Sequence, residues 1–239
     1  MRDRLAQGRV GCHAVRRLEL QANLNAEEYA NLAQVEATHW YYAGKREFVR
    51  DWLLRERPPQ PSDRLLDVGA GTGRFADEMQ ACCRVQVLDD HDAALRLLSA
   101  RFRPEQILRL NDERVPLPDA ALDYVTALDV LEHTPDDAAV VAEFLRILKP
   151  GGLALITVPA SMALWSDWDV ALHHFRRYSR SGLKGLFRGE QWELRHVNYT
   201  NVAVYPAIWL VRKWRKRFPT GTRERAEDQL PAPWLNAVL

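Results

Sequence analysis

The sequence predicts an α/β protein in which a parallel sheet is covered by helices on both faces. Between residues 64 and 160, short apolar runs alternate with amphipathic stretches of helical length. A glycine-rich turn at residues 69–73 joins the first apolar run to the first amphipathic stretch. Because parallel strands require crossover connections and are buried on both sides, this alternation indicates repeated strand–helix units within one sheet.

Each element follows from a local pattern. Residues 25–60 are predicted to be helical, because Asn25 is a suitable N-cap and apolar residues then recur every three or four positions; Gly44 is expected to divide two helices. Thr134 is expected to open the helix that runs to residue 148. The other elements are predicted as strands at residues 64–68, 84–89, 121–128 and 153–158, and as helices at residues 72–83 and 92–102.

The composition of the 239-residue chain excludes several classes of protein. A formal net charge of +1, with 47% apolar and 27% charged residues, gives no overall electrostatic signal for nucleic acid. Three cysteines, Cys12, Cys82 and Cys83, are too few for a disulfide framework or a zinc cage, so no metal site is predicted. No run reaches the ~18 apolar residues of a membrane span and no signal-peptide core is found, so the sequence predicts a cytoplasmic protein.

The glycine turn carries the main functional signal. Gly69, Gly71 and Gly73 form G-x-G-x-G, which differs from the G-x-G-x-x-G of dinucleotide folds, and the Lys-Ser/Thr ending of a P-loop is absent. Asp67, at the end of the preceding strand, would repel a pyrophosphate and attract an ammonium or sulfonium group. Asp89, at the end of the second strand, stands where a carboxylate can accept hydrogen bonds from two ribose hydroxyls. The predicted ligand is a nucleoside that carries positive charge.

Four segments make the chain resemble a class I S-adenosylmethionine (SAM)-dependent methyltransferase of the type 11 group. LLDVGAGTGRF resembles motif I, VLDDHDAAL resembles the ribose-binding stretch, NDERVPLPDAALDYVTALDVLEH resembles the segment that cups adenine, and LRILKPGGLALITVP resembles the helix, turn and fifth strand. These matches lie in the family order over residues 64–160. The resemblance implies a Rossmann-like methyltransferase fold with a mostly parallel sheet of six or seven strands, SAM as cofactor and S-adenosylhomocysteine as product.

The resemblance also implies which residues bind the cofactor. They are Asp67, Gly69, Ala70, Gly71, Gly73, Asp89, Asp90, Asn111, Asp112 and Asp129. Asn111, followed by Asp112, departs from the family, which usually has aspartate there; an amide can still donate and accept hydrogen bonds at an adenine edge. Asp129 is expected to touch the methionyl end of SAM or the acceptor, with a hydrogen bond to a loop amide as the alternative.

Three histidines are candidates for work on the acceptor. Methyl transfer from a sulfonium needs no fixed catalytic residue, but a hydroxyl acceptor benefits from a general base. His133 follows the fourth strand and is a candidate for direct contact, with a structural role over the cofactor as the alternative. His173 and His174 follow the fifth strand and are candidates for a base or a substrate contact, with an ordinary surface histidine as the alternative.

Aromatic and basic residues are predicted to bind the acceptor. A lid over an apolar acceptor would be formed by Trp40, Tyr41 and Tyr42 together with Trp165 and Trp168; for the first three, ordinary packing between the N-terminal helices and the sheet is the alternative. Arg176 and Arg177, next to Tyr178, would bind a phosphate or carboxylate, and a solvated basic loop is the alternative.

The chain divides into four predicted parts. They are a flexible extension at residues 1–24, a helical segment at residues 25–60 that closes over the cofactor, a SAM-binding methyltransferase domain at residues 61–200, and a basic apolar helix and tail at residues 201–239. Residues 202–218 join an apolar run to five basic residues, the composition of a helix that lies on an anionic membrane surface. A buried helix with a solvated end is the alternative. We therefore expect peripheral contact with the inner membrane face and a lipid-linked acceptor.

The predicted function is transfer of a methyl group from SAM to an O, N or C atom of a small or lipid-linked metabolite. One alternative is a SAM-binding protein without catalysis, and another is an RNA methyltransferase. A nucleic-acid partner is not expected, because the chain has no NPPY-like tetrapeptide and no cysteine near the fourth or fifth strand for attack on cytosine.

Overall fold

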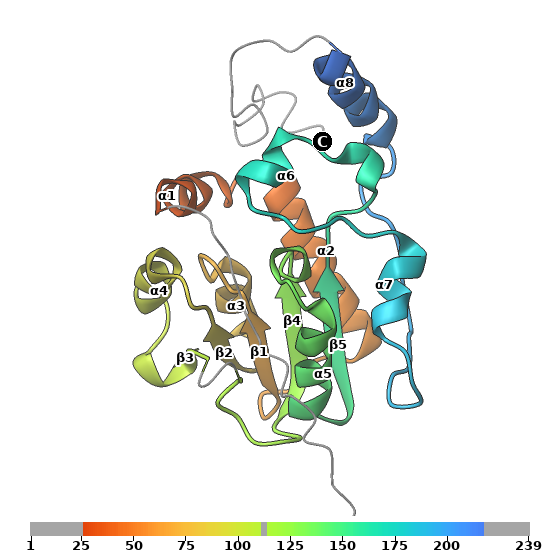
Figure 1. Ribbon diagram of the computed structural model, residues 1–239. Coiled ribbons are helices and arrows are strands. Elements are labelled where there is room, and N and C mark those ends of the chain that lie inside the picture. The colour runs from red at the N-terminus through yellow and green to blue at the C-terminus, as the bar shows by residue number, and fades with distance from the viewer. Residues whose placement is uncertain (1–25, 111–113, 218–239) are drawn as a thin grey trace, which may run out of the picture.

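The computed structural model describes residues 26–110 and 114–217 and confirms the α/β class. Its five-stranded sheet has the order β3-β2-β1-β4-β5, and each pairing is parallel (Figure 1). The strands are β1 (Arg64–Val68), β2 (Arg84–Leu88), β3 (Ile107–Leu108), β4 (Leu122–Leu128) and β5 (Leu148–Thr157). The expected count of six or seven strands is wrong for the part of the chain described, because the segments after β5 form short helices and loops. The strand order reverses between β1 and β4, which is where open α/β sheets bind ligands.

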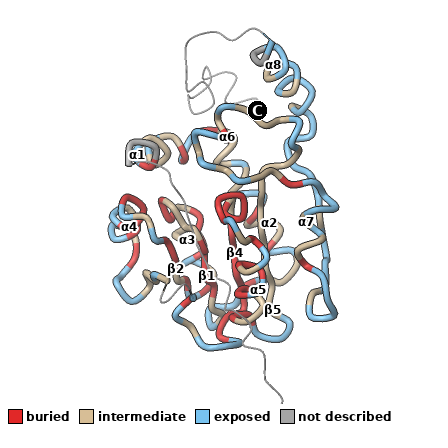
Figure 2. The backbone as a smooth tube through the Cα atoms, in the orientation of Figure 1, coloured by how far each residue is buried: buried red, intermediate tan, exposed pale blue. Residues whose placement is uncertain are grey.

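Two hydrophobic cores lie on opposite faces of the sheet. Leu65 packs into one core and Leu66 into the other, because successive side chains of a strand point to opposite faces. The Leu65 core contains side chains of α2 (Trp40–Glu56), α3 (Arg74–Met79) and α4 (Asp92–Ser99). The Leu66 core contains side chains of α5 (Asp137–Ile147) and α7 (Arg180–Leu186). The buried segments in Figure 2 are concentrated in the central strands and α5, as this layered arrangement requires.

Three helices lie beyond the carboxyl end of the sheet, where the strand arrows point in Figure 1. They are α1 (Ala26–Val35), α6 (Asp167–Ala171) and α8 (Tyr205–Arg217). The single-turn 3₁₀ helices are η1 (Pro104–Gln106), η2 (Leu131–His133) and η3 (Met162–Leu164). No helix in residues 26–110 and 114–217 is long and apolar enough to cross a membrane.

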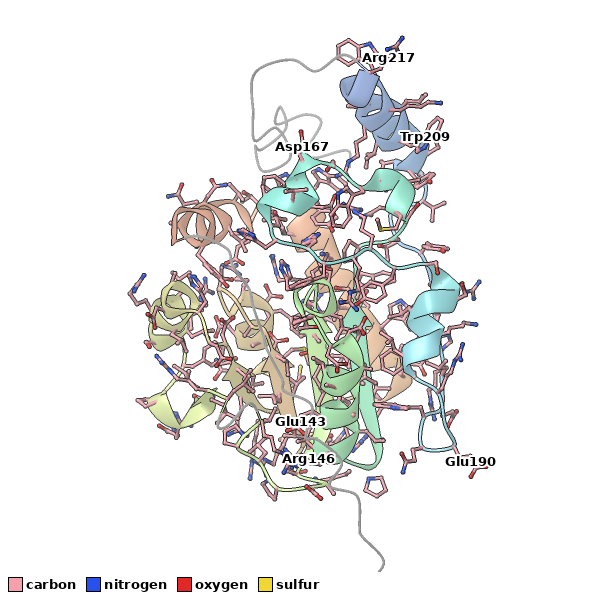
Figure 3. All side chains as sticks on the ribbon, in the orientation of Figure 1. Glu143, Arg146, Asp167, Glu190, Trp209 and Arg217 are labelled. Atoms are coloured by element: carbon pink, nitrogen blue, oxygen red, sulfur yellow. The ribbon has the colours of Figure 1, made fainter. Side chains whose placement is uncertain are left out.

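The opposite end of the sheet is fixed by a network around Arg146 of α5, labelled with Glu143 in Figure 3. The Arg146 guanidinium donates to the Glu143 carboxylate at 2.6 Å and to the Leu117 carbonyl at 2.7 Å. Glu143 also accepts from the Val115 amide at 3.0 Å. These contacts hold the loop that leads into β4 against α5.

Two expected helix boundaries are wrong. The break between the first two helices falls at residues 36–39, where His39 Nδ1 accepts from the Tyr41 amide at 3.2 Å, and Gly44 lies inside α2. Thr134 does not cap α5, because its hydroxyl donates to the Leu131 carbonyl. Asp136 is the N-cap instead, and its carboxylate accepts from the Ala139 amide at 3.0 Å.

We expect Gly44→Ala to stabilise the fold by about 1 kcal/mol, because glycine in a helix interior costs about that much relative to alanine. Gly44 is exposed within α2, and an added Cβ would meet no atom within 4 Å. The measurement is the free energy of unfolding in urea. A denaturation midpoint equal to or below that of the parent would contradict this prediction.

Candidate active site

The glycine loop adopts a backbone that only glycine adopts readily. Gly69, Gly71 and Gly73 have φ values of 64°, 58° and 76°. A Cβ on Gly69 would lie 2.7 Å from Val130, and a Cβ on Gly73 would lie 2.6 Å from both Leu98 and Phe102. A Cβ on Gly71 would meet nothing nearer than 3.8 Å. Gly69 and Gly73 therefore serve close packing, whereas Gly71 borders open space where a ligand can approach the backbone.

This difference predicts unequal effects of the same substitution. Gly73→Ala should destabilise the protein by about 2–5 kcal/mol, because the left-handed backbone costs 1–2 kcal/mol and overpacking adds 1–3 kcal/mol. Gly71→Ala, the matched control, should incur only the backbone cost. The free energies of unfolding of both variants, measured without ligand, test this expectation; equal losses would contradict it.

Asp89 follows β2 and is 3% exposed. Its two carboxylate oxygens accept backbone hydrogen bonds from Gly71 at 3.0 Å and from His91 at 2.9 Å. Burial raises the pKa of Asp89, although both backbone hydrogen bonds oppose the shift. The carboxylate is thus fixed against the glycine loop and borders the cavity described below.

Asp67 lies one residue before the end of β1 and is 3% exposed. One carboxylate oxygen accepts from the Thr126 hydroxyl of β4 at 2.6 Å. Burial raises the pKa of Asp67 to about 7; the Thr126 hydrogen bond lowers it, and the charge of Asp89 raises it further. The Asp67 and Asp89 carboxylates are therefore both buried and border the same cavity. A cationic ligand there would reduce the repulsion between them.

Asp129 follows β4 with a φ of 57°, a left-handed conformation that is uncommon outside glycine. Its carboxylate accepts from the Thr157 hydroxyl of β5 at 2.9 Å and from the ammonium of Lys45 in α2. The Lys45 ammonium also lies 4.5 Å from the centroid of the Tyr41 ring. Burial would raise the pKa of Asp129, but Lys45 holds it below the ordinary value. The Lys45–Asp129 ion pair joins α2 to the carboxyl end of β4, next to the point where the strand order reverses.

The turn η2 places Glu132 and His133 side by side, and His174 approaches them from the segment after α6. The His133 and His174 rings meet edge to face, with 4.6 Å between their centroids. Burial, followed by the charge of His174, lowers the pKa of His133 to about 4. Burial, followed by the charge of Asp129, raises the pKa of Glu132 well above its ordinary value.

Asp169 of α6 orients His174. Its carboxylate is fully buried, lies 2.9 Å from His174 Nδ1 and accepts from the Arg177 guanidinium at 2.6 Å. It also accepts from the Ser166 amide at 2.8 Å. Burial would raise the pKa of Asp169, but the hydrogen bonds from His174 and Arg177 hold it well below the ordinary value. An ionised Asp169 therefore fixes Nδ1 of His174 as the protonated nitrogen.

One cavity of about 2100 Å³ runs from the glycine loop past the end of β4 and along β5 to α8, and all of these carboxylate and histidine groups except Asp169 line it. This volume exceeds the 300–1,000 Å³ typical of a site for one small ligand, so a cofactor and an acceptor can occupy it together. The residues predicted from sequence that line it are Trp40, Tyr41, Tyr42, Asp67, Gly69, Ala70, Gly71, Asp89, Asp90, Asp129, His133, Trp168, His174 and Arg177.

Other predicted residues lie elsewhere. Arg176 donates to the Pro135 carbonyl at 2.7 Å and pairs with Asp137 at 3.0 Å, and Tyr178 donates to the same carboxylate at 2.8 Å. His173 is exposed, and neither it nor Trp165 is among the residues that line the cavity. Gly73 is buried by packing. Asn111 and Asp112 fall outside the described residues.

Four residues of the site were not predicted from sequence: Lys45, Glu36, Glu132 and Asp169. Glu36, at the end of the first helical region, accepts from the Thr72 hydroxyl of the glycine loop at 2.6 Å. Only Glu132 had a local signal, since it adjoins His133 directly after a strand. Lys45, Glu36 and Asp169 belong to the site through contacts with residues elsewhere in the chain, and the spacing of residues in the sequence does not reveal such contacts.

The site and fold together define the class of protein. A family of methyltransferase domains matches residues 40–197, more than half of the chain, so the protein belongs to this family. The class is that of the class I SAM-dependent methyltransferases, which confirms the family and the cofactor predicted from sequence.

Curated relatives agree with this class. A Mycolicibacterium smegmatis protein named "Probable S-adenosylmethionine-dependent methyltransferase" is 35% identical over 112 residues, which cover 46% of this chain and 44% of the relative. The malonyl-[acyl-carrier protein] O-methyltransferase of Serratia marcescens is 34% identical over 132 residues, which cover 52% of each chain. The chain thus spans about half the length of these relatives.

Solved structures share the fold at low sequence identity. Haemonchus contortus phosphoethanolamine N-methyltransferase 2, in complex with SAM, aligns with a TM-score of 0.65 and 16% identity over 91% of this chain and 54% of that chain. A chain of the complex between the Haloferax volcanii Trm112 methyltransferase activator and a methyltransferase aligns with a TM-score of 0.57 and 20% identity, over 84% and 86% of the two chains.

Proposed function

We propose that the protein transfers a methyl group from SAM to an oxygen atom of a lipid-linked or otherwise apolar metabolite. One observation carries this proposal: a single cavity joins the Asp67 and Asp89 carboxylates to a buried cluster of Glu132, His133 and His174 and then to α8. The carboxylate end suits the cationic cofactor, and the remaining space suits an acceptor.

The buried cluster favours oxygen as the methylated atom. In the transfer, the acceptor oxygen forms a bond to the methyl carbon, the carbon–sulfur bond breaks, and its electron pair stays on sulfur to give S-adenosylhomocysteine. A hydroxyl acceptor must lose its proton in this step, so side chains that favour ionisation of the hydroxyl are needed beside it. Glu132, His133 and His174, which cluster after the end of β4, are such side chains. The Serratia marcescens relative, named an O-methyltransferase, is consistent with an oxygen acceptor.

The far end of the cavity favours an apolar acceptor. Tyr205, Ile208 and Val211 of α8 line it and are also exposed to solvent at 40%, 37% and 49%. Leu210 and Trp214 of the same helix are exposed at 58% and 57%. The helix carries five basic residues and no acidic one. In Figure 3 its labelled residues Trp209 and Arg217 lie at the carboxyl end of the sheet, far from Glu143 and Arg146.

We therefore expect α8 to bind vesicles that contain anionic lipid. Leu210→Glu combined with Trp214→Glu should abolish co-sedimentation, because each change removes exposed apolar surface and adds a like charge to that of the membrane. Leu54→Glu, which changes a 39% exposed residue of α2, is the matched control and should bind as the parent does. Equal binding by parent and double variant would contradict a role for α8.

Methyl-labelled SAM tests the acceptor class. The full chain is incubated with labelled SAM and a cell extract, and the label is measured in the organic, protein and RNA fractions. We expect acid-stable label in the organic phase, and none with Asp89→Ala. Label in RNA would overturn the proposal in favour of an RNA methyltransferase. SAM binding without label in any fraction would favour a binding protein without catalysis.

A further inference from the structure

Three possible metal ligands converge beside the acceptor end of the cavity. One ligand atom from each of Glu132, His133 and His174 can be chosen so that all three lie within 4.8 Å of one another. Two separate segments supply them, and the Phe175 amide joins those segments by donating to the Glu132 carbonyl at 2.7 Å. The convergence is therefore fixed by the backbone.

The cluster contains buried atoms that lack hydrogen bonds. Glu132 is fully buried, and neither of its carboxylate oxygens has a hydrogen-bond partner on another residue within residues 26–110 and 114–217. Nδ1 of His133, a residue only 8% exposed, also lacks one in that part of the chain. An unsatisfied buried polar group costs about 1–3 kcal/mol, and more when it is charged. A cation bound by the cluster would give a partner to buried atoms that otherwise have none.

In each histidine, one ring nitrogen is already hydrogen-bonded to the protein, and the other nitrogen is left for a cation. His174 Nδ1 lies 2.9 Å from Asp169 Oδ1, so Nε2 is directed away from that carboxylate. His133 hydrogen-bonds to the Leu172 backbone, which leaves Nδ1 as the remaining nitrogen. Metal-binding histidines almost always donate their other N–H to a carboxylate or a backbone carbonyl. Both of these histidines have that arrangement.

We propose that Glu132, His133 and His174 bind a divalent first-row transition-metal ion with a coordination position open to the cavity. Two imidazoles and one carboxylate form a donor set used by zinc and related ions, whereas magnesium prefers carboxylates and water. Such an ion lowers the pKa of a bound hydroxyl. Only this catalytic role depends on the proposed function; the binding of the ion does not.

Cobalt(II) binding tests the site without cofactor or acceptor. Untagged full chain, freed of metal by a chelator, is titrated with Co²⁺, and the visible d–d absorption reports coordination by the protein. We expect one equivalent to bind and to be displaced by Zn²⁺. Glu132→Gln and His174→Ala should each lose this absorption, and Asp169→Asn, which removes a positioning residue, should weaken binding by about 10–100-fold.

His173→Ala is the matched control, because His173 is exposed and outside the cluster. It should bind Co²⁺ as the parent does. Thermal unfolding without metal shows whether each variant folds, and Zn²⁺ should raise the melting temperature of the parent but not that of Glu132→Gln. Absence of Co²⁺ and Zn²⁺ binding by the parent, or equal binding by Glu132→Gln, would overturn the inference.

The two proposals fail independently. If no hydroxyl compound accepts the methyl group, the proposed function is overturned, whereas the Co²⁺ result stands. If Co²⁺ binding fails while labelled methyl reaches an oxygen acceptor, the metal site is overturned and the proposed function stands.

Discussion

Replacing Asp89 with alanine should raise the dissociation constant for SAM by at least about a hundredfold. The carboxylate is fixed by the Gly71 and His91 amides and borders the cavity, where it can accept from two ribose hydroxyls. A hydrogen bond to a charged group contributes about 1.5–3 kcal/mol, so two correspond to a factor of about 10²–10⁴. Calorimetric titration with SAM measures this change.

The control is Asp92→Asn in the first turn of α4. Asp92 is exposed and pairs with Arg109 only at 4.0 Å, so its loss should leave SAM affinity almost unchanged. Melting temperatures of both variants without SAM show whether the fold survives. An affinity of Asp89→Ala within threefold of the parent would show that this carboxylate does not hold the ribose.

The carboxyl end of the sheet was predictable from sequence because strand order and strand ends follow from short local patterns. Asp67 is the penultimate residue of β1, and Asp89 and Asp129 directly follow β2 and β4; parallel strands bring their carboxyl ends to one edge. His133 and His174 were each recognised as candidates, but nothing in their spacing shows that their rings meet. Long-range contacts set that geometry.

Local patterns failed where a tertiary contact competes with them. Gly44 is a helix breaker by propensity, yet α2 continues through it because Val49 and Leu53 further along the helix are fully buried. Arg176 looked suited to an anionic acceptor, but Asp137 and two carbonyls engage its guanidinium. Lys45 gave no signal, since its partner Asp129 lies in a different part of the sequence.

The affinity for SAM should fall about tenfold when the pH decreases from 8 to 6, because of Asp67. Burial raises the pKa of Asp67 to about 7, and the nearby Asp89 charge adds to this, so the free protein takes up a proton over that range. The cationic cofactor favours the carboxylate, so below pH 7 binding must expel the proton. Calorimetry in buffers of different ionisation enthalpy measures both the affinity and the proton release.

Asp67→Asn should remove this pH dependence and weaken SAM binding at pH 8. It should also stabilise the free protein at pH 8. A carboxyl whose folded pKa exceeds its unfolded value loses stability as the pH rises from the unfolded to the folded pKa, and the difference between 3.8 and about 7 corresponds to roughly 4 kcal/mol. The Thr126 hydroxyl can still donate to the amide oxygen, so the substitution leaves the hydrogen bond in place. An unchanged melting temperature at pH 8, together with unchanged pH dependence of binding, would show that another group titrates.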